Sequence, residues 1–277
     1  MIADLHCHTT FSDGSFSPKE LIKLAHKKNI NAIAITDHDT IDGILEGKKY
    51  AKEYDIKFLN GIEFAASYED REIHILGYNF DITEEFKTAL KEIVIERENR
   101  NNKMIALLQN ENIDITLDDL KAVAGGNIIS RAHFANVLVD KNYVTHKDKA
   151  FKKYLDIGCK TYIPRKYISP KDCIDLLHKA NGVAVLAHPT LYGLPFEKVK
   201  TLITYLKDLG LDGVEVKHST YSYEQEAFLT NFTKKMNILQ TGGSDFHGTF
   251  KKGLNLGTGY GKLHIPYKMY EDVISFK

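Results

Sequence analysis

NAIAITDHDT, residues 31–40, is a run of small and β-branched side chains that ends in acidic and imidazole groups. A short apolar run of this kind predicts a buried strand followed by a polar loop. The pattern returns along the chain, with amphipathic helices expected between most of its copies. The expected strands are Ile2–His6, 31–36, 57–64, 72–80, 183–187, 212–216 and 238–242, and the expected helices are Pro18–Lys28, Thr40–Tyr54, 170–180, 196–209 and 223–235. Near-continuous apolar strands that alternate with helices predict a parallel sheet covered on both faces and closed into an α/β barrel.

The strand pattern is absent between about Glu84 and Pro164, where several helices are expected in succession. We therefore predict a barrel formed by residues 1–83 and 165–277, with a helical insertion, residues 84–164, that forms a lid over the substrate. Because no linker rich in Pro, Gly or Ser separates the two parts, we expect one interdependent unit rather than two tethered domains.

Composition excludes several classes of protein. The chain has 277 residues, 43% of them hydrophobic, so it can bury a core and is neither disordered nor fibrous. Its 37 basic and 37 acidic side chains cancel, which leaves no field to attract a long duplex nucleic acid but allows a short polyanion in a local basic pocket. The three cysteines form no CxxC pair, and neither a leader nor an apolar membrane span is recognisable. We therefore expect a cytoplasmic protein that contacts no membrane.

Metal-type side chains follow nearly every expected strand. His6 and His8 are two residues apart at the end of the first strand, so their side chains share one face. A lone histidine there is more often a hydrogen-bonded polar residue than a ligand, but the pattern recurs at six strand ends. In a parallel barrel these ends meet at one mouth, where we expect nine ligands: His6, His8, Asp13, His38, Glu63, His74, His188, Asp245 and His247. Imidazole and carboxylate without thiolate suit Mn²⁺, Fe²⁺ or Zn²⁺, and nine ligands are too many for one ion.

Further polar residues flank these ligands. Asp4, Asp37 and Asp39 are expected either to hold the imidazoles in the right tautomer or to serve as solvated or helix-capping residues. Glu215 and His218 follow a later strand and are not needed to complete the metal site. The predicted ligand set is therefore complete without them.

Two arginines of the insertion are the first expected phosphate contacts. The helix around residues 90–108 has an apolar stripe that includes Arg97 and Arg100, so both side chains are expected to face inward. Guanidinium groups suit bidentate phosphate binding. The alternative is an internal ion pair with Glu96, Glu98 or a carboxylate of the barrel.

Two more basic segments follow. Arg131 and His133 come after a glycine pair at the start of another expected helix, whose free N–H groups favour an anion. The alternative is an exposed pair at a helix start. Arg165 and Lys166 could join the same pocket, but they lie beside a proline and are expected in a solvated loop.

Six motifs occur together in a fixed order. They are DLHCHTTFSDG (4–14), ITDHDT (35–40), GIE (61–63), HILGY (74–78), AHP (187–189) and GGSDFH (242–247). In this combination the chain resembles the PHP family, named for its polymerase and histidinol phosphatase members. The resemblance implies a distorted (β/α)₇ barrel with three divalent ions, for which Mn²⁺ is the first choice. The insertion, with ISRAHFANVLV (129–139) and KTYIPRKYISP (160–170), is similar to one branch, phosphoesterases that act on nucleoside 3′,5′-bisphosphates or on the 5′ ends of short RNA.

The resemblance also implies a role for each ligand. Carried onto matching positions, it places a first ion between His6, His8, Glu63 and Asp245, a second between Glu63, His74 and His188, and a third between Asp13, His38 and His247. It further implies substrate contacts around Arg131 and His133. We expect the catalytic residues among Asp13, His38 and His247, because a histidine beside the metal can pass a proton to the leaving oxygen.

The predicted reaction is metal-assisted hydrolysis of a phosphomonoester or of a terminal phosphodiester. We expect a monomer that acts on a small phosphorylated nucleotide or a short RNA. The nearest alternative is a histidinol-phosphate phosphatase, although the arginines of the insertion fit a second phosphate better. An amidohydrolase-type enzyme would instead cleave C–N bonds, and a metal-bound accessory factor for replication would show no turnover.

Overall fold

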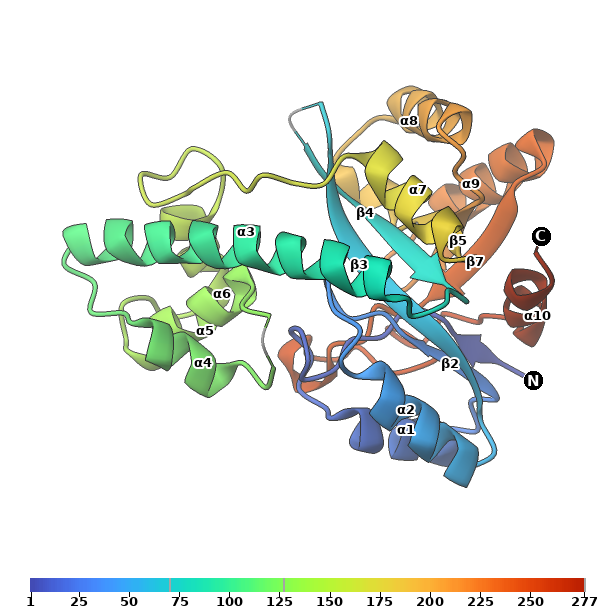
Figure 1. The fold of residues 1–277 in the computed structure, drawn as a ribbon, viewed down its shortest axis with the longest axis horizontal. Coiled ribbons are helices and arrows are strands. Elements are labelled where there is room, and N and C mark those ends of the chain that lie inside the picture. Colours follow the sequence, from blue (N-terminus) through green and yellow to red (C-terminus); the bar gives the residue numbers. More distant parts are fainter. Residues whose placement is uncertain (70, 127, 277) are drawn as a thin grey trace.

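The computed structural model describes residues 1–69, 71–126 and 128–276. Within these residues, seven strands form a single sheet in chain order: β1 (Ala3–Asp4), β2 (Ala32–Ile35), β3 (Lys57–Tyr68), β4 (Arg71–Tyr78), β5 (Val183–Leu186), β6 (Gly213–His218) and β7 (Leu239–Gly243). The backbone N–H of Leu5 donates to Gly242 O, and that of His8 donates to Phe246 O. These bonds bring the two edges together, so the sheet curves into a nearly closed barrel (Figure 1).

One strand runs against the others. β4 is antiparallel to both β3 and β5, whereas the remaining neighbours are parallel, so the expected all-parallel sheet is wrong at this strand. Tyr68 pairs directly with Arg71, and two intervening residues are too few for the crossover that a parallel pair requires. The first half of β4 therefore reaches the same mouth as the carboxyl ends of the other strands.

Helices cover the outside of the barrel. They are α1 (Pro18–Lys27), α2 (Ile44–Glu53), α7 (Pro170–Lys179), α8 (Phe196–Asp208), α9 (Tyr223–Met236) and α10 (Tyr267–Ser275). α1 begins where expected because Ser17 and Glu20 form a capping box and proline occupies the first turn. α2 begins four residues later than expected, at Ile44 rather than Thr40, and β1 is shorter than the expected strand, so His6 and His8 lie just beyond it.

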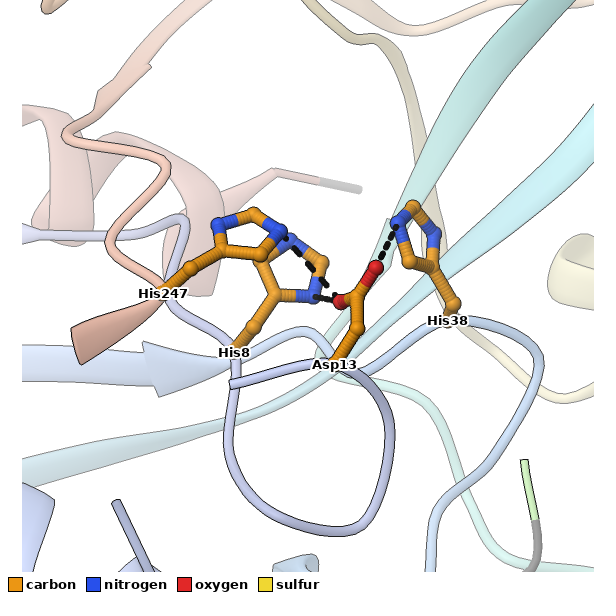
Figure 2. A group of neighbouring side chains, drawn as sticks. All are labelled: His8, Asp13, His38 and His247. Carbon is orange, nitrogen blue, oxygen red and sulfur yellow. Dashed lines mark ion pairs between the residues drawn. The ribbon is translucent and has the colours of Figure 1, made fainter. Parts of the chain in front are cut away.

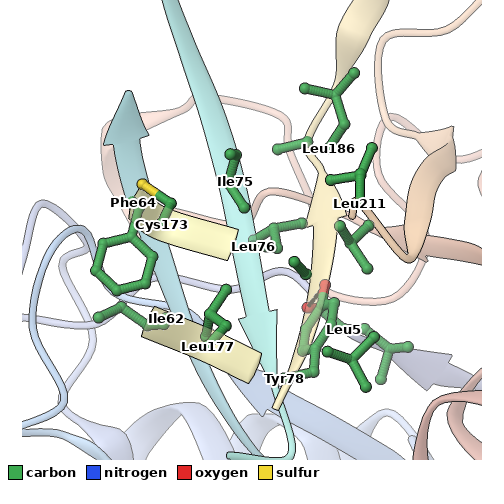
Figure 3. Close-up of a cluster of buried hydrophobic side chains, with 14 of the residues drawn as sticks. Leu5, Ile62, Phe64, Ile75, Leu76, Tyr78, Cys173, Leu177, Leu186 and Leu211 are labelled. Carbon is green, nitrogen blue, oxygen red and sulfur yellow. Dashed lines mark hydrogen bonds between the residues drawn. The ribbon is translucent and has the colours of Figure 1, made fainter. Parts of the chain in front are cut away.

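Alternation along β3 separates the core from the site. Ile62 and Phe64 are fully buried and pack outward toward Cys173 and Leu177 of α7 (Figure 3). Glu63, between them, therefore points into the barrel. On the next strand, the Tyr78 hydroxyl donates to Leu5 O at 2.8 Å, which ties β4 to the end of β1.

A second group of helices lies between β4 and α7 in the sequence. It contains α3 (Glu84–Asn110), α4 (Leu117–Val123), α5 (Arg131–Asp140), α6 (Lys147–Ala150) and the π-helix η1 (Phe151–Leu155). α3 crosses from the barrel to the smaller helices, which gather around its far end (Figure 1). Its first turns pack in the barrel core through Phe86, Leu90 and Ile93, and its last turns pack in a separate core through Met104 and Leu108. The expected run of helices is confirmed, while its role as a lid stays a prediction.

Within the described residues, none of the helices combines the length and the hydrophobicity needed to span a lipid bilayer.

Candidate functional site

One carboxylate lies at the centre of the barrel mouth, among five imidazoles. The Oε2 atom of Glu63 lies 3.3, 3.2 and 3.1 Å from the facing ring nitrogens of His6, His8 and His38. Its Oε1 atom lies 2.8 and 3.0 Å from those of His74 and His188. The two oxygens thus divide the imidazoles into two groups, an arrangement suited to a carboxylate that bridges two ions. His74 reaches this group because β4 runs in the opposite direction to its neighbours.

A second carboxylate gathers an overlapping group. Asp13 Oδ1 lies 3.3 Å from His247 Nε2 and 3.7 Å from His8 Nδ1, and its Oδ2 lies 3.8 Å from His38 Nε2 (Figure 2). His8 and His38 therefore turn one ring nitrogen to Glu63 and the other to Asp13. Asp245 adds its Oδ1 atom at 3.3 Å from His8 Nε2. All nine residues expected as ligands lie in this connected group, called the ligand cluster below.

The ligand cluster contains buried polar atoms without hydrogen-bond partners. Among the described residues, His6 Nε2, His8 Nε2, His38 Nδ1, Asp13 Oδ1 and Glu63 Oε2 are of this kind. Such atoms normally cost free energy, so their convergence calls for a partner. Nitrogen and carboxylate oxygen are the donors that divalent transition metals accept. The residues present therefore fit a metal centre.

The backbone beside the cluster is held in strained conformations. His188 and Asp245 have φ values of 27° and 55°, which cost non-glycine residues about 1–3 kcal/mol each and persist where the surroundings fix them. A Cβ atom on Gly243 would lie 2.0 Å from that of His6. Only glycine therefore lets β7 pass behind this imidazole, and the barrel fixes the position of the ring.

Two carboxylates outside the cluster orient its imidazoles. Glu215 Oε1 lies 3.0 Å from His6 Nδ1, and its Oε2 accepts the backbone N–H of His188 at 2.8 Å. Glu72 Oε1 lies 3.3 Å from His74 Nε2. From the sequence, Glu215 was judged unnecessary for the metal site and Glu72 was not identified. The alternation of side chains along the strands could have indicated both, since Glu72 lies two residues before His74 on β4.

The aspartates expected beside the imidazoles have other partners. Asp4 accepts the backbone N–H groups of Ser244 and Gly257 at 2.8 and 2.7 Å. Asp37 accepts the backbone N–H of Thr9 at 2.7 Å and the Ser12 hydroxyl at 2.5 Å. Both fix the loops that carry the ligands, and neither is hydrogen-bonded to an imidazole. Asp39 accepts from Arg97 and Arg165 instead of an imidazole. All three aspartates are buried, so they are neither tautomer-fixing residues nor solvated ones.

Protonation in the cluster reflects these close contacts. Burial alone would raise the pKa of Glu63, but the imidazoles of His74, His38 and His6 hold it well below its ordinary value. Burial would lower the pKa of His74, but Glu63 and Glu72 raise it to about 10. Burial lowers the pKa of His38 to about 3. A divalent cation would displace the proton on an imidazole such as His74, as ligands must be deprotonated to bind metal.

A cavity of about 170 Å³ adjoins the cluster, and four arginines also line it. Asp13, His38 and His74 line it from the cluster, and Arg97, Arg100, Arg131 and Arg165 line it together with them. We call these four residues the arginine wall. They bring together α3, the start of α5 and the segment before α7, so the cavity lies between barrel and insertion.

Two members of the wall share a single carboxylate. Asp39 Oδ2 accepts from Arg97 and, at 2.8 Å, from Arg165. Arg97 thus makes the barrel ion pair expected as the alternative to phosphate contact. Arg165 is buried against Asp39, so the solvated position expected for it is wrong, whereas Lys166 beside it is exposed as expected. One negative charge against two positive charges leaves a net attraction for an anion.

The other two members differ in their partners. Arg131 donates to Glu72 Oε2 at 2.9 Å, and the Tyr167 hydroxyl donates to the same oxygen at 2.7 Å. Arg100 is buried as expected, but the hydrogen bond that its guanidinium donates is a weak one, to Met104 Sδ at 3.5 Å. Burial and the neighbouring arginines lower the Arg100 pKa to about 10, which still leaves it charged at neutral pH.

Three further basic side chains, those of His133, Lys251 and His218, have partners of their own near the site. His133 does not line the cavity: its Nδ1 accepts the Ser130 N–H at 3.1 Å in a capping box, so its contact with substrate stays a prediction. Lys251 Nζ lies 2.5 Å from Asp245 Oδ2, a neighbour that sequence reasoning missed because no strand precedes it. His218 Nε2 lies 3.5 Å from the same oxygen.

Comparison with known proteins shows which family the chain belongs to. Residues 4–162 match the PHP domain. A 5′-3′ exoribonuclease of Haemophilus influenzae is 37% identical over 91% of this chain and 93% of its own, and a 3′,5′-nucleoside bisphosphate phosphatase of Chromobacterium violaceum is 32% identical over 92% and 90%. A crystal structure from Bifidobacterium adolescentis, assigned as a metal-dependent phosphoesterase, superposes with a TM-score of 0.86 at 30% identity over 98% of this chain and 94% of its own. By its domain match and its near full-length relatives, this chain belongs to the PHP family.

Proposed function

We propose that this chain is a metal-dependent phosphoesterase that hydrolyses nucleoside 3′,5′-bisphosphates or short 5′-phosphorylated oligoribonucleotides. One observation carries the proposal: three residues of the ligand cluster, Asp13, His38 and His74, line the same 170 Å³ cavity as the arginine wall. A substrate with two phosphates can place the reacting phosphate against the cluster and the other against the wall. The names of the relatives from Haemophilus influenzae and Chromobacterium violaceum agree with such substrates.

The proposed metal centre holds three divalent ions, with Mn²⁺ as the first choice. The nine residues of the ligand cluster would hold them, with Glu63 shared between two ions. When bound, the ions supply activation of water and neutralise charge on the phosphoryl oxygens. We assign the catalytic roles to Asp13, His38 and His247, of which Asp13 and His38 line the cavity beside the arginine wall.

The arginine wall would bind the phosphate that is not cleaved. Arg100 has no carboxylate partner among the described residues, so its guanidinium is free to bind an anion. Arg131 is held in place by Glu72, which also contacts His74 of the cluster. Glu72 therefore fixes the distance between the two binding regions, and with it the spacing of phosphates that the cavity accepts.

The remaining proposals concern partners and location. This cavity and a neighbouring one of about 310 Å³, which share His38, Glu72, His74 and Arg131 in their linings, are small beside a duplex, which supports the exclusion of duplex nucleic acid. This chain alone supplies both walls of the cavity, which supports a monomer. Free thiols at Cys7, Cys159 and Cys173 support a reducing, cytoplasmic environment.

The test measures phosphate release with Mn²⁺ from adenosine 3′,5′-bisphosphate, a 5′-phosphorylated trinucleotide and histidinol phosphate. Wild type should cleave one or both of the first two. Arg131→Ala should lose most of that rate, while Lys103→Ala, which removes an exposed charge from α3, should keep it. Cleavage of histidinol phosphate alone, unaffected by Arg131→Ala, would contradict the proposal and favour the alternative phosphatase.

A further inference from the structure

The cavity contains one phenyl ring, that of Phe151, that stacks on no other side chain among the described residues. Phe151 is partly buried and lines the cavity together with the arginine wall and the ligand cluster. Among the described residues, no aromatic stack and no cation–π contact involves its ring. Part of the side chain packs on the core of the insertion, which anchors it.

Tyr167, the other phenyl-type side chain that lines the cavity, already has partners at both its hydroxyl and its ring. Its hydroxyl donates to Glu72 at 2.7 Å, and the Arg165 guanidinium lies 5.4 Å from its ring centroid. A ligand that stacked on Tyr167 would compete with this arginine. Phe151 is therefore the ring that can accept a planar ligand without losing a contact.

The backbone presents Phe151 in an uncommon way. α6 ends at Ala150, and the chain continues as the π-helix η1, in which the Phe151 carbonyl accepts the Asp156 N–H at 2.9 Å. A turn of π-helix has about one more residue than a turn of α-helix and is frequently found at functional sites. Here the widened turn begins at the residue that lines the cavity.

We infer that Phe151 is the stacking platform for the nucleobase of the substrate, an inference that rests on the proposed function. With phosphates held by the cluster and the wall, the base is the part of a nucleotide left to bind an apolar face. Every base has a π-face, so stacking on a phenyl ring selects for a base without selecting its identity. The site should accept the 3′,5′-bisphosphates of all four nucleosides and discriminate against sugar bisphosphates that lack a base.

The test compares adenosine 3′,5′-bisphosphate with its abasic analogue, the same sugar bisphosphate with hydrogen in place of the base at C1. Phe151→Leu keeps apolar volume but removes the aromatic face, and Phe151→Tyr keeps the ring. For Phe151→Leu we expect the KM of the nucleotide to rise about tenfold, with kcat and the KM of the abasic compound unchanged. Phe151→Tyr should restore the KM of wild type, and the melting temperatures should agree.

The outcomes separate this inference from the function on which it rests. Equal changes of KM for both substrates, or none for either, would overturn the role of Phe151 while the phosphoesterase activity stands. The role would also be overturned if the KM of the nucleotide rose to that of the abasic compound in Phe151→Tyr as well as in Phe151→Leu. If wild type cleaves neither substrate, the proposed function fails, and this inference fails with it.

Discussion

The arginine wall and part of the ligand cluster line one cavity, but different forces hold them. The cluster lies at the ends of barrel strands, where backbone hydrogen bonds and close packing, as at Gly243 against His6, fix each side chain. The wall comes from the insertion and from the segment before α7. Three of its four arginines, Arg97, Arg165 and Arg131, are held by ion pairs to two barrel residues, Asp39 and Glu72.

This difference determines how each region should respond to change. Removing a residue of the cluster should affect metal binding while the barrel remains folded, because the strands do not depend on the ligands for their pairing. Removing Asp39 from beneath the wall should leave two buried guanidinium groups without a partner, which costs free energy of folding. The predictions below test that distinction.

The largest expected effect is at Glu63, the centre of the cluster. Glu63→Gln removes the charge that lies among five imidazoles, so bound metal and phosphatase activity should both fall more than about a hundredfold, beyond the usual cost of losing an outer partner. Elemental analysis of the purified variant measures the first effect. Glu53→Gln, an exposed change on α2, is the control and should retain metal. Full metal content in Glu63→Gln would contradict the bridging role.

Asp39 should give the largest effect on stability. Asp39→Asn leaves Arg97 and Arg165 buried beside a neutral amide, at a cost of about 3–5 kcal/mol in the free energy of unfolding by urea. Metal content of the folded variant should stay close to that of wild type. A stable variant that had lost its metal would mean that the two regions are not held separately.

The same variant predicts a dependence on pH. Burial would raise the Asp39 pKa, but the two arginines hold it below its ordinary value of 3.8. Stability from this carboxylate is therefore fully present above the unfolded value and is lost as pH falls through the lower folded value. The difference in unfolding free energy between wild type and Asp39→Asn should shrink below about pH 4. A difference that grew with acid would contradict the assignment.

Glu215 should have a smaller effect, confined to the cluster. Glu215→Gln weakens the bond that orients the His6 ring, so metal affinity should fall about 10- to 100-fold while the unfolding curve of the protein with metal removed changes little. Competition with a metal-selective chelator measures the affinity. Unchanged affinity would show that packing against Gly243 alone orients the ring.

Glu72 should have the smallest effect, and it links the two regions. Glu72→Gln keeps the shape but weakens the bonds to Arg131 and His74, so KM should rise about fivefold with little change in stability. Steady-state kinetics on adenosine 3′,5′-bisphosphate measure it. A change in metal content without a change in KM would place Glu72 with the cluster alone.

The sequence predicted the cluster because strand ends and alternation are local properties. His6 and His8 are two residues apart, and GGSDFH follows a strand directly, so the barrel alone brings them together. The direction of β4 was not predicted, although the shortness of the connection between β3 and β4 implied it. His74 was still placed correctly, because reversing the strand carries its first half to the mouth.

The wall was predicted only in part because its ion pairs join distant segments. Arg97 and Arg100 were identified by the helical stripe of α3, which is local. Asp39 and Arg165 are 126 residues apart, and no periodic pattern connects them. The sequence thus showed that arginines face inward, while the carboxylates that position them required the tertiary structure.

The most direct test of the account is whether the wall holds a second phosphate. kcat/KM would be measured with Mn²⁺ for adenosine 3′,5′-bisphosphate and for each of the two adenosine monophosphates, in wild type and in Arg100→Ala. We expect wild type to prefer the bisphosphate, and we expect Arg100→Ala to lose this preference while its rate on the monophosphates is unchanged. Equal preference in both proteins would contradict it, because the second phosphate would then bind elsewhere.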